Sequence, residues 1–506
     1  MRFSFRKTMK EKHEESYSHV LKYTGIFGGV QGLNILISLI RNKIVAKLLG
    51  PGGMGLTSLF NSSVSFISTS TGFGISFSAV RHVSELFEEG NQQKITHFVK
   101  VVRGWSLLAA LLGMLVCVLL GPALSNYTFS WGDHTLHFIL LAPAVGMLAI
   151  TGGETAILKG AHRLKSLAVI QVINVFVALL ISIPLYYFFG ETAIVPVIVL
   201  MALSTMLLTL WHSYRLYPLR LRGAKGILGE GMEMVRLGVA FIIAGAIGSG
   251  AEMLVRSYLN VTSNLDIVGF YNAGFLLTMT YGGMVFSAME TDYFPRLSAV
   301  NTDRLLSNQT VNRQIEVSLL IISPMLLALI FGAPIIIPLL FTSDFLPVVP
   351  MVRITALALY LRAIKLPICY MPLAKGDSKT FMLVEVSYYV VMVVAIYFGY
   401  KWWGLTGTGI ALLAAAMFEF LLIMVMTYFR YGYIMTASVV KYAVPQISLG
   451  VLGLIVSIHT QGLAFWILAI VMVSVSLAFS LYILHSKTSL WNKLTGRYKT
   501  GKGSES

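Results

Sequence analysis

The chain alternates between long apolar stretches and short polar connections along almost its whole length. A helix that crosses a membrane needs about 20 predominantly apolar residues, and fourteen stretches meet this requirement. Only 12% of the 506 residues are charged and 56% are hydrophobic, whereas a soluble domain carries roughly 25% charged residues. This excludes a soluble enzyme, a nucleic-acid-binding protein and a disordered scaffold. We expect an all-α integral membrane protein with spans at 23–44, 54–80, 104–121, 136–157, 166–186, 193–213, 237–258, 266–289, 316–341, 349–373, 380–397, 405–428, 439–457 and 463–484.

The basic residues divide sharply between alternate connections. Thirty of the 38 Lys and Arg residues lie on one side of the predicted spans, and two, Lys47 and Lys401, lie on the other. Lys and Arg are concentrated in cytoplasmic loops, so the split places both termini in the cytoplasm. The formal net charge of +16 therefore reflects membrane orientation and gives no reason to expect a nucleic-acid partner.

The connections themselves carry no recognisable catalytic machinery. The longest outward one, at about 122–135, has no Lys or Arg. No P-loop, H-E-x-x-H or C-x-x-C motif occurs, and the two cysteines, Cys117 and Cys369, lie inside apolar stretches. We therefore expect no enzymatic activity and no cofactor. An integral-membrane polymerase or glycosyltransferase would be expected to carry its catalytic residues in a sizeable outward loop, and the sequence predicts no such loop.

Short segments recur at an offset near 215 residues. The segment Ser38–Arg41, with Gly55 after it, corresponds to the segment Met253–Arg256, with Gly269 after it. In the same way, Lys159-Gly160 corresponds to Lys375-Gly376. The order predicts two parallel six-helix lobes about a pseudo-twofold axis along the membrane normal, a layout typical of transporters, plus a C-terminal helix pair. The expected parts are an N-terminal cytoplasmic segment (1–22), an N-lobe (23–214), a cytoplasmic inter-lobe loop (215–236), a C-lobe (237–430), the helix pair (437–485) and a basic cytoplasmic tail (486–506).

Two motifs and this layout resemble a known group. The segment Ala46-Lys-Leu-Leu-Gly-Pro-Gly-Gly-Met-Gly55 and the exit Leu158-Lys-Gly160 are similar to those of polysaccharide flippases of the multidrug/oligosaccharidyl-lipid/polysaccharide exporter superfamily. The resemblance implies movement of a polyprenyl-diphosphate-linked oligosaccharide across the bacterial cytoplasmic (inner) membrane by alternating access. It also implies membrane lipids and a polysaccharide polymerase or chain-length machinery as partners. A multidrug or cation antiporter shares the fold, so fold alone does not choose the substrate.

Four basic residues inside the spans are candidates for a cationic, substrate-binding cavity. Arg41 and Arg256 occupy equivalent places in the two repeats, and Arg362 and Lys365 share one helix face because they are three residues apart. A diphosphate needs such donors, and Arg presents a planar fork to phosphate oxygens. The alternative is that Arg41 and Arg256 extend to the membrane surface from the ends of their helices.

Three intramembrane carboxylates are candidates for coupling transport to Na+ or H+. These are Glu252, Glu385 and Glu419, which all fall in the predicted C-lobe. Glu252 lies one helical turn before Arg256, so a purely structural ion pair remains an open alternative. A fourth acid, Glu154, could pair with a base of the cavity or contact a sugar.

Overall fold

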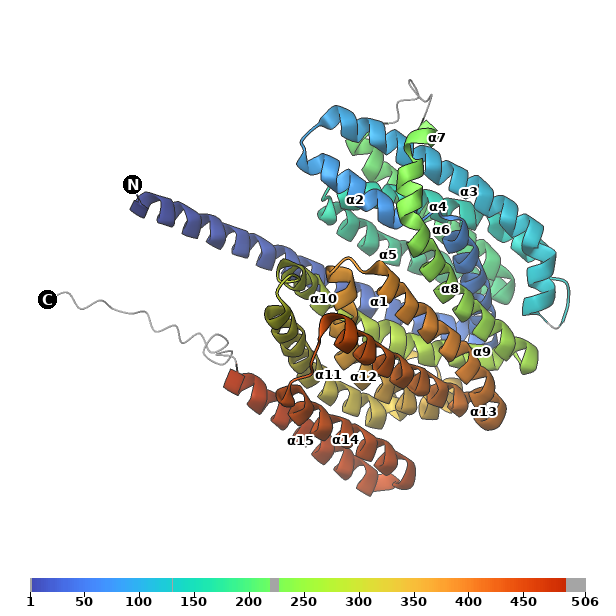
Figure 1. The fold of residues 1–506 in the computed structure, drawn as a ribbon. Helices are drawn as coiled ribbons and strands as arrows, with labels where there is room; N and C mark the ends of the chain where they lie inside the picture. The colour runs from blue at the N-terminus through green and yellow to red at the C-terminus, as the bar shows by residue number, and fades with distance from the viewer. Residues whose placement is uncertain (1, 130, 219–226, 488–506) are drawn as a thin grey trace. The chain divides into compact units, whose positions relative to one another are not determined.

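The computed structural model describes residues 2–129, 131–218 and 227–487, and every regular element in this part of the chain is a helix. The all-α prediction is therefore confirmed. Contacts divide the chain into two compact units (Figure 1). Unit 1 extends to Gly269 and also includes Leu340–Thr342, and unit 2 comprises Phe270–Leu339 and the residues from Ser343 onward. Residues 219–226 of the predicted inter-lobe loop and 488–506 of the predicted tail lie outside the described residues, and the lobe boundaries stay predictions.

The helices follow the apolar stretches closely. The elements that begin before Phe270 are α1 (Arg2–Thr71), α2 (Ile75–Glu88), α3 (Gln92–Thr128), α4 (Thr135–Gly160), α5 (Leu164–Phe189), the 3-10 helix η1 (Gly190–Ala193), α6 (Ile194–Leu216), α7 (Ile227–Glu230), α8 (Met232–Thr262) and α9 (Leu265–Phe275). Those that follow are the π-helix η2 (Leu276–Tyr281), α10 (Gly282–Ala299), α11 (Arg304–Leu340), the 3-10 helix η3 (Ser343–Val348), α12 (Val349–Ala374), α13 (Ser378–Tyr431), α14 (Ala437–His459) and α15 (Gly462–Lys487).

Long helical runs are interrupted where the sequence predicts short outward connections. In α1 the backbone leaves the helical region at Gly50, whose φ is 65°, and in α13 it does so at Trp403 and Gly404. Glycine tolerates positive φ without a steric penalty, so these positions turn the chain between consecutive spans. The predicted span 54–80 differs from the structure, because α1 ends at Thr71 and α2 begins at Ile75 after two residues with positive φ, Phe73 and Gly74.

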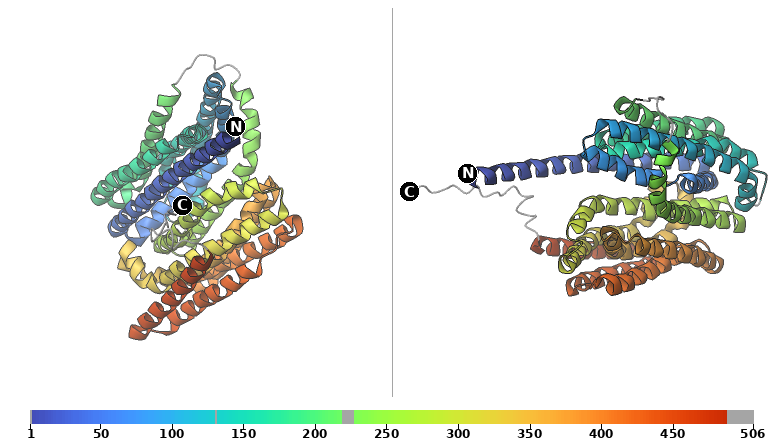
Figure 2. Two further views of the ribbon diagram at one scale, coloured as in Figure 1. Left: turned by 90° about the vertical axis from the view of Figure 1, so that its left-hand side faces the viewer. Right: turned by 45° about the horizontal axis from the view of Figure 1, so that its top comes forward.

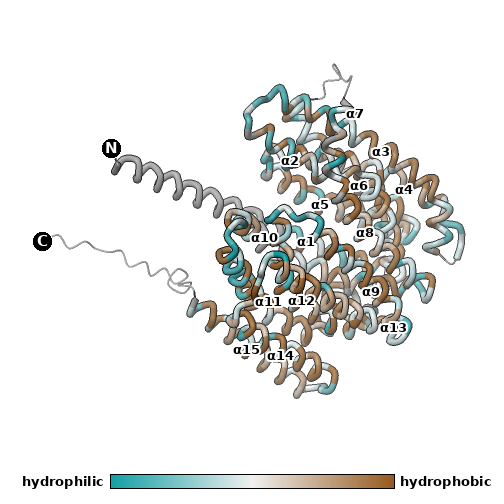
Figure 3. Tube along the Cα trace, in the orientation of Figure 1, coloured by the Kyte–Doolittle hydropathy of each residue, from teal (hydrophilic) through white to brown (hydrophobic). Residues whose placement is uncertain are grey.

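Eight helical runs of the described residues are long and apolar enough to cross a membrane. Two of them, Lys165–Leu216 and Ser378–Tyr431, have 52 and 54 residues, more than twice the length that one crossing needs. Figure 3 shows apolar residues along α3, α4 and α11 to α15, with polar residues gathered near helix ends and connections. The chain is a multi-pass membrane protein, and the count of fourteen spans stays a prediction.

The repeated glycines Gly55 and Gly269 lie against each other's helices inside unit 1. A Cβ on Gly55 would overlap the carbonyl of Leu265 and the backbone nitrogen of Gly269. A Cβ on Gly269 would overlap the carbonyl of Pro51. The bend at Gly50–Pro51 and the first turns of α9 therefore pack backbone to backbone, and only glycine fits.

Replacing Gly269 by Ala is expected to lower the free energy of unfolding by about 1–3 kcal/mol, the usual cost of overpacking. Thermal unfolding of the purified protein measures the loss. Gly32→Ala is the control, because nothing lies within 4 Å of its added Cβ. Equal effects of the two substitutions would contradict the close approach.

Arg353 joins three helices of unit 2 through backbone carbonyls. Its Nε donates to the carbonyl of Ile330 at 3.0 Å and its Nη1 to that of Ser457 at 2.9 Å. Pro334 has no N–H, so the carbonyl four residues before it, at Ile330, has no intrahelical donor. Ser457 lies in the last turn of α14, where carbonyls also lack partners. Arg353 therefore supplies donors to α11 and α14, and α15 lies beside α14 (Figure 2).

Asp377 closes the connection between α12 and α13. Gly376, with φ of 73°, ends α12, and the carboxylate of Asp377 accepts hydrogen bonds from the backbone N and the Oγ1 of Thr380 as the N-cap of α13. The same carboxylate accepts from Tyr431 Oη at 2.7 Å and pairs with Arg430 at 3.0 Å. Burial raises the pKa of Asp377, but these hydrogen bonds and the Arg430 charge outweigh it and lower the pKa to about 2.

Asp377→Ala is expected to lower the free energy of unfolding by about 1–2 kcal/mol at neutral pH, the usual value of a cap. Because the folded pKa is depressed, the contribution is fully present above the ordinary value near 3.8 and is lost only as pH falls through about 2. The difference in free energy of unfolding between the wild-type protein and the variant should therefore be the same at pH 5.5 and pH 8. Asp303→Ala removes a cap that accepts from Leu306 N, and it should lower the free energy of unfolding by a smaller amount. A loss at pH 8 that disappears by pH 5.5 would contradict the assignment.

Candidate functional site

The side chains of α12 and α13 form a partly buried charge cluster in unit 2, defined by Arg362, Lys365, Glu385 and Glu419. Arg362 and Lys365 lie three residues apart on α12, and the two glutamates come from the two halves of α13. Glu385 lies within electrostatic reach of the other three charged groups. The structure thus brings together four of the seven residues that the sequence singled out.

Lys365 and Glu419 form the innermost contact of this charge cluster. Their ammonium and carboxylate groups form an ion pair, with side chains 13% and 1% exposed. The Lys365 ammonium also lies 5.1 Å from the ring centroid of Tyr388, one turn after Glu385 on α13. Each group supplies the partner that the other needs, because an isolated buried charge loses its hydration without compensation.

Arg362 has a different kind of partner. Its Nη1 donates to the backbone carbonyl of Met279 at 3.3 Å, and its guanidinium carbon lies 5.7 Å from the ring centroid of Phe286. Met279 belongs to the π-helix η2, a wider turn that is frequent at functional sites. The guanidinium also lies beside Gly283 of α10, where an added Cβ would be 3.4 Å from its Nη2. A guanidinium bonded to a carbonyl keeps its full charge and has further N–H donors for an anion.

The predicted pair of Arg41 and Arg256 lies in unit 1. Arg256 is 6% exposed, and its Nε donates to Ser58 Oγ at 2.7 Å. Its Nη1 binds the carboxylate of Glu252 at 3.0 Å. Arg41 is partly buried on α1, within electrostatic reach of Tyr186 on α5. Glu252 thus has the structural ion pair that its spacing allowed, while the transport roles of all three residues stay predictions.

Glu154 pairs with a base, as one of its two predicted alternatives allowed, but the sequence did not identify that base as Arg103. Arg103 on α3 binds Glu154 on α4 through two contacts, Nε to Oε1 at 2.8 Å and Nη2 to Oε2 at 3.3 Å. Its Nη1 also donates to the Tyr217 carbonyl at 2.9 Å, and the guanidinium lies 4.1 Å from the Tyr214 ring centroid. These contacts hold α3, α4 and the end of α6 together. Glu154 is therefore explained by packing within the unit.

The fold is that of transporters of the MOP superfamily. A structure of the lipid II flippase MurJ, in an inward closed conformation, matches with a TM-score of 0.71 and 14% identity, covering 91% of this chain and 99% of that chain. An inward-facing multidrug resistance MATE family transporter matches with a TM-score of 0.65 and 16% identity, covering 79% and 94%. A MOP superfamily transporter from Pyrococcus furiosus matches with a TM-score of 0.58 and 14% identity, covering 81% and 94%.

The family follows from the sequence. A family model described as polysaccharide biosynthesis protein matches residues 44–350, and the chain belongs to this family. Comparison with curated protein sequences gives no match. The matched structures are those of transporters and flippases, not of enzymes.

Proposed function

We propose that the protein is a flippase that moves a polyprenyl-diphosphate-linked oligosaccharide across the bacterial cytoplasmic membrane by alternating access. The family and the fold support a transport role in polysaccharide biosynthesis. The observation that carries the substrate class is Arg362, an intramembrane guanidinium hydrogen-bonded to a backbone carbonyl. A diphosphate that enters the membrane interior loses its hydration and needs charged donors of this kind.

A cation antiporter is the second candidate, because MATE family transporters share the fold. Such a protein needs a site that favours positive charge. In the charge cluster of unit 2 an arginine and a lysine accompany the two glutamates, and Lys365 already contacts Glu419. A cationic drug would have to displace that ammonium and approach Arg362. The basic side chains therefore favour an anionic substrate.

We also propose that Glu385 and Glu419 couple transport to a proton gradient. An Na+ ion would have to share the two carboxylates with the ammonium of Lys365, which repels it. A proton needs no coordination shell, and a carboxyl group in apolar surroundings can be present as the neutral acid. Glu252 is the weaker candidate because its side chain, which pairs with Arg256, is 37% exposed, against 1% for that of Glu419.

The test is movement of a fluorescent polyprenyl-diphosphate oligosaccharide in proteoliposomes, followed under an inward or outward proton gradient, a sodium gradient or no gradient. Proton-driven movement that Glu385→Gln abolishes would support both proposals. Sodium-driven movement would overturn the proton assignment alone. Failure of the folded protein to move the lipid under every gradient, together with efflux of a cationic dye, would favour the antiporter. Glu85→Gln, at an exposed ion pair with Arg81, is the control.

A further inference from the structure

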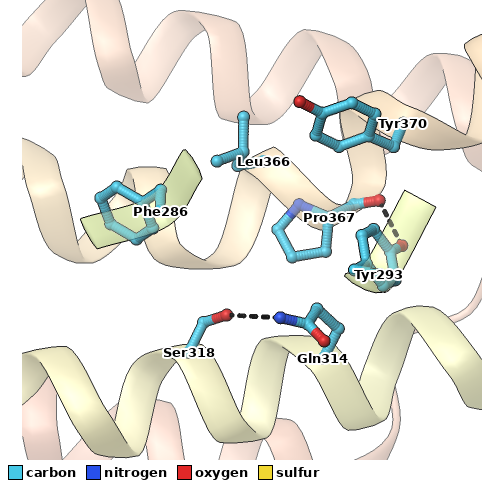
Figure 4. A pocket seen from close by; sticks show the side chains of 7 residues that line it. All are labelled: Phe286, Tyr293, Gln314, Ser318, Leu366, Pro367 and Tyr370. Carbon is cyan, nitrogen blue, oxygen red and sulfur yellow. Dashed lines mark hydrogen bonds between the residues drawn. The ribbon is translucent and has the colours of Figure 1, made fainter. Parts of the chain in front are cut away.

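His134 of unit 1 departs from the rule that buried polar side chains have hydrogen-bond partners. It is 7% exposed, and neither ring nitrogen has a partner of ordinary geometry within the described part of the chain. The pocket of about 10 Å³ in unit 2 follows the rule (Figure 4): Tyr293 donates to the Pro367 carbonyl at 2.7 Å and Gln314 to Ser318 Oγ at 3.4 Å. An imidazole without such partners is a candidate for a ligand, and its simplest ligand is a proton.

Aromatic rings surround the imidazole of His134. The Phe129 ring is stacked on it with centroids 4.0 Å apart, and the Trp131 ring meets it at 88° with centroids 4.6 Å apart. The rings of His137 on α4 and Phe60 on α1 follow at 5.0 and 6.4 Å. We call these five residues the aromatic cluster. It attaches the connection between α3 and α4, which the sequence predicts on the outward side of the membrane, to α1.

The surroundings of His134 favour its neutral form. Burial lowers its pKa below the ordinary value of 6.5 and the nearby His137 lowers it further, while the Trp131 backbone and the carboxylate of Asp133 act in the opposite direction. The ring from α1 and the hydroxyl group that α3 contributes carry no charge. His134 also directly precedes the first turn of α4, and the positive end of a helix dipole disfavours a cation there.

Protonation would place two N–H donors and a positive charge inside the aromatic cluster. Stacking on Phe129 offers the imidazolium a cation–π contact, but this contact satisfies neither donor. The remaining ties of the connection run through Ser125 on α3, whose hydroxyl accepts from His134 N at 2.8 Å and donates to Asp133 at 3.4 Å. Both ties end on the histidine or its neighbour, so an imidazolium that moves toward water breaks them.

We propose that His134 is a proton-binding site and that its protonation releases the connection between α3 and α4 from the aromatic cluster. The site is separate from the carboxylates of the charge cluster and does not depend on which lipid is transported. Its effect would reach α8. Thr128, at the end of α3, accepts from Asn260 at 2.8 Å and from Ser257, the residue after Arg256, at 3.3 Å.

The first test is backbone hydrogen exchange of residues 125–138 in the full-length protein, compared with that of His134→Phe at the same pH. Phenylalanine keeps a ring in the aromatic cluster and cannot be protonated. Exchange should be equal at pH 7.5. At pH 5 the wild-type protein should exchange at least about tenfold faster, since one unpaired buried donor suffices for a factor of this size. Equal exchange at pH 5 would overturn the proposal.

The second test follows the fluorescence of Trp131 between pH 8 and pH 4.5, taken as the difference between the wild-type protein and Trp131→Phe. A protonated imidazole quenches an adjacent indole, so the signal should titrate with a midpoint below 6.5. His134→Phe should abolish the titration, and His97→Gln, at an exposed histidine, should preserve it. A titration that persists in His134→Phe would assign the proton to another group and overturn the proposal.

Two further variants keep the proposal testable if His134→Phe does not fold. His137→Gln removes a group that opposes the charge on His134, so the fluorescence midpoint should move to higher pH. Asp133→Asn removes a group that favours the charge, so the midpoint should move to lower pH. A midpoint that is the same in both variants and in the wild-type protein would show that His134 is not the titrating group.

Discussion

Replacing Lys365 by Met is expected to lower the free energy of unfolding by about 3–5 kcal/mol. The substitution removes the ammonium that contacts Glu419, a side chain only 1% exposed. Removing one member of a buried ion pair is costly because the remaining charge has neither water nor a partner. Methionine fills a similar volume with flexible apolar atoms, so the loss reports the charge and not a cavity. Thermal and chemical unfolding of the purified protein in detergent measure it.

The double substitution Lys365→Met, Glu419→Gln should be compared with the single substitution Lys365→Met. It removes both charges, and replacing a whole buried pair is often nearly neutral. We expect it to recover most of the stability that the single substitution loses. Lys401→Met, at an exposed position, should have little effect. A double variant as unstable as Lys365→Met would show that the ion pair is not the cause.

The sequence predicted the all-α class, the connections that contain Gly50 and Gly404, and the charged residues that are neighbours on one helix. Apolar length gives the spans because the membrane interior offers no partners to backbone groups, and glycine marks the turns at Gly50 and Gly404 for steric reasons. It also placed Arg362 beside Lys365 and Glu252 beside Arg256, since three and four residues along a helix define a shared face.

Contacts between distant segments were not accessible in this way. Arg103 and Glu154 are 51 residues apart, and Arg103 resembles any basic residue of a cytoplasmic connection until α3 is seen to begin at Gln92. The interaction of Arg362 with Met279 involves a backbone carbonyl, which no side-chain pattern reveals. Similarly, Arg353 reaches a carbonyl that Pro334 leaves without a donor. The position of a proline in a helix predicts which carbonyl lacks a donor, but not which side chain donates to it.

Arg362→Gln is expected to reduce translocation of the lipid-linked oligosaccharide at least about 100-fold in proteoliposomes. The glutamine can still donate a hydrogen bond, so the change isolates the positive charge and the planar fork that binds phosphate oxygens. A loss of about 2.7 kcal/mol, within the range of a charge-assisted hydrogen bond, corresponds to this factor. Arg362→Lys keeps the charge without the fork and should lose about tenfold.

Three features make this result specific to the site. Arg362 donates to a carbonyl and not to a buried carboxylate, so its removal should destabilise the protein less than that of Lys365. Lys47→Gln removes one positive charge from an exposed position and should transport normally. Binding of pyrophosphate should fall with translocation, because we propose that both depend on the same guanidinium. Normal transport by a stable Arg362→Gln protein would show that Arg362 does not bind the diphosphate. Arg41 and Arg256 would then be the next candidates for its binding site.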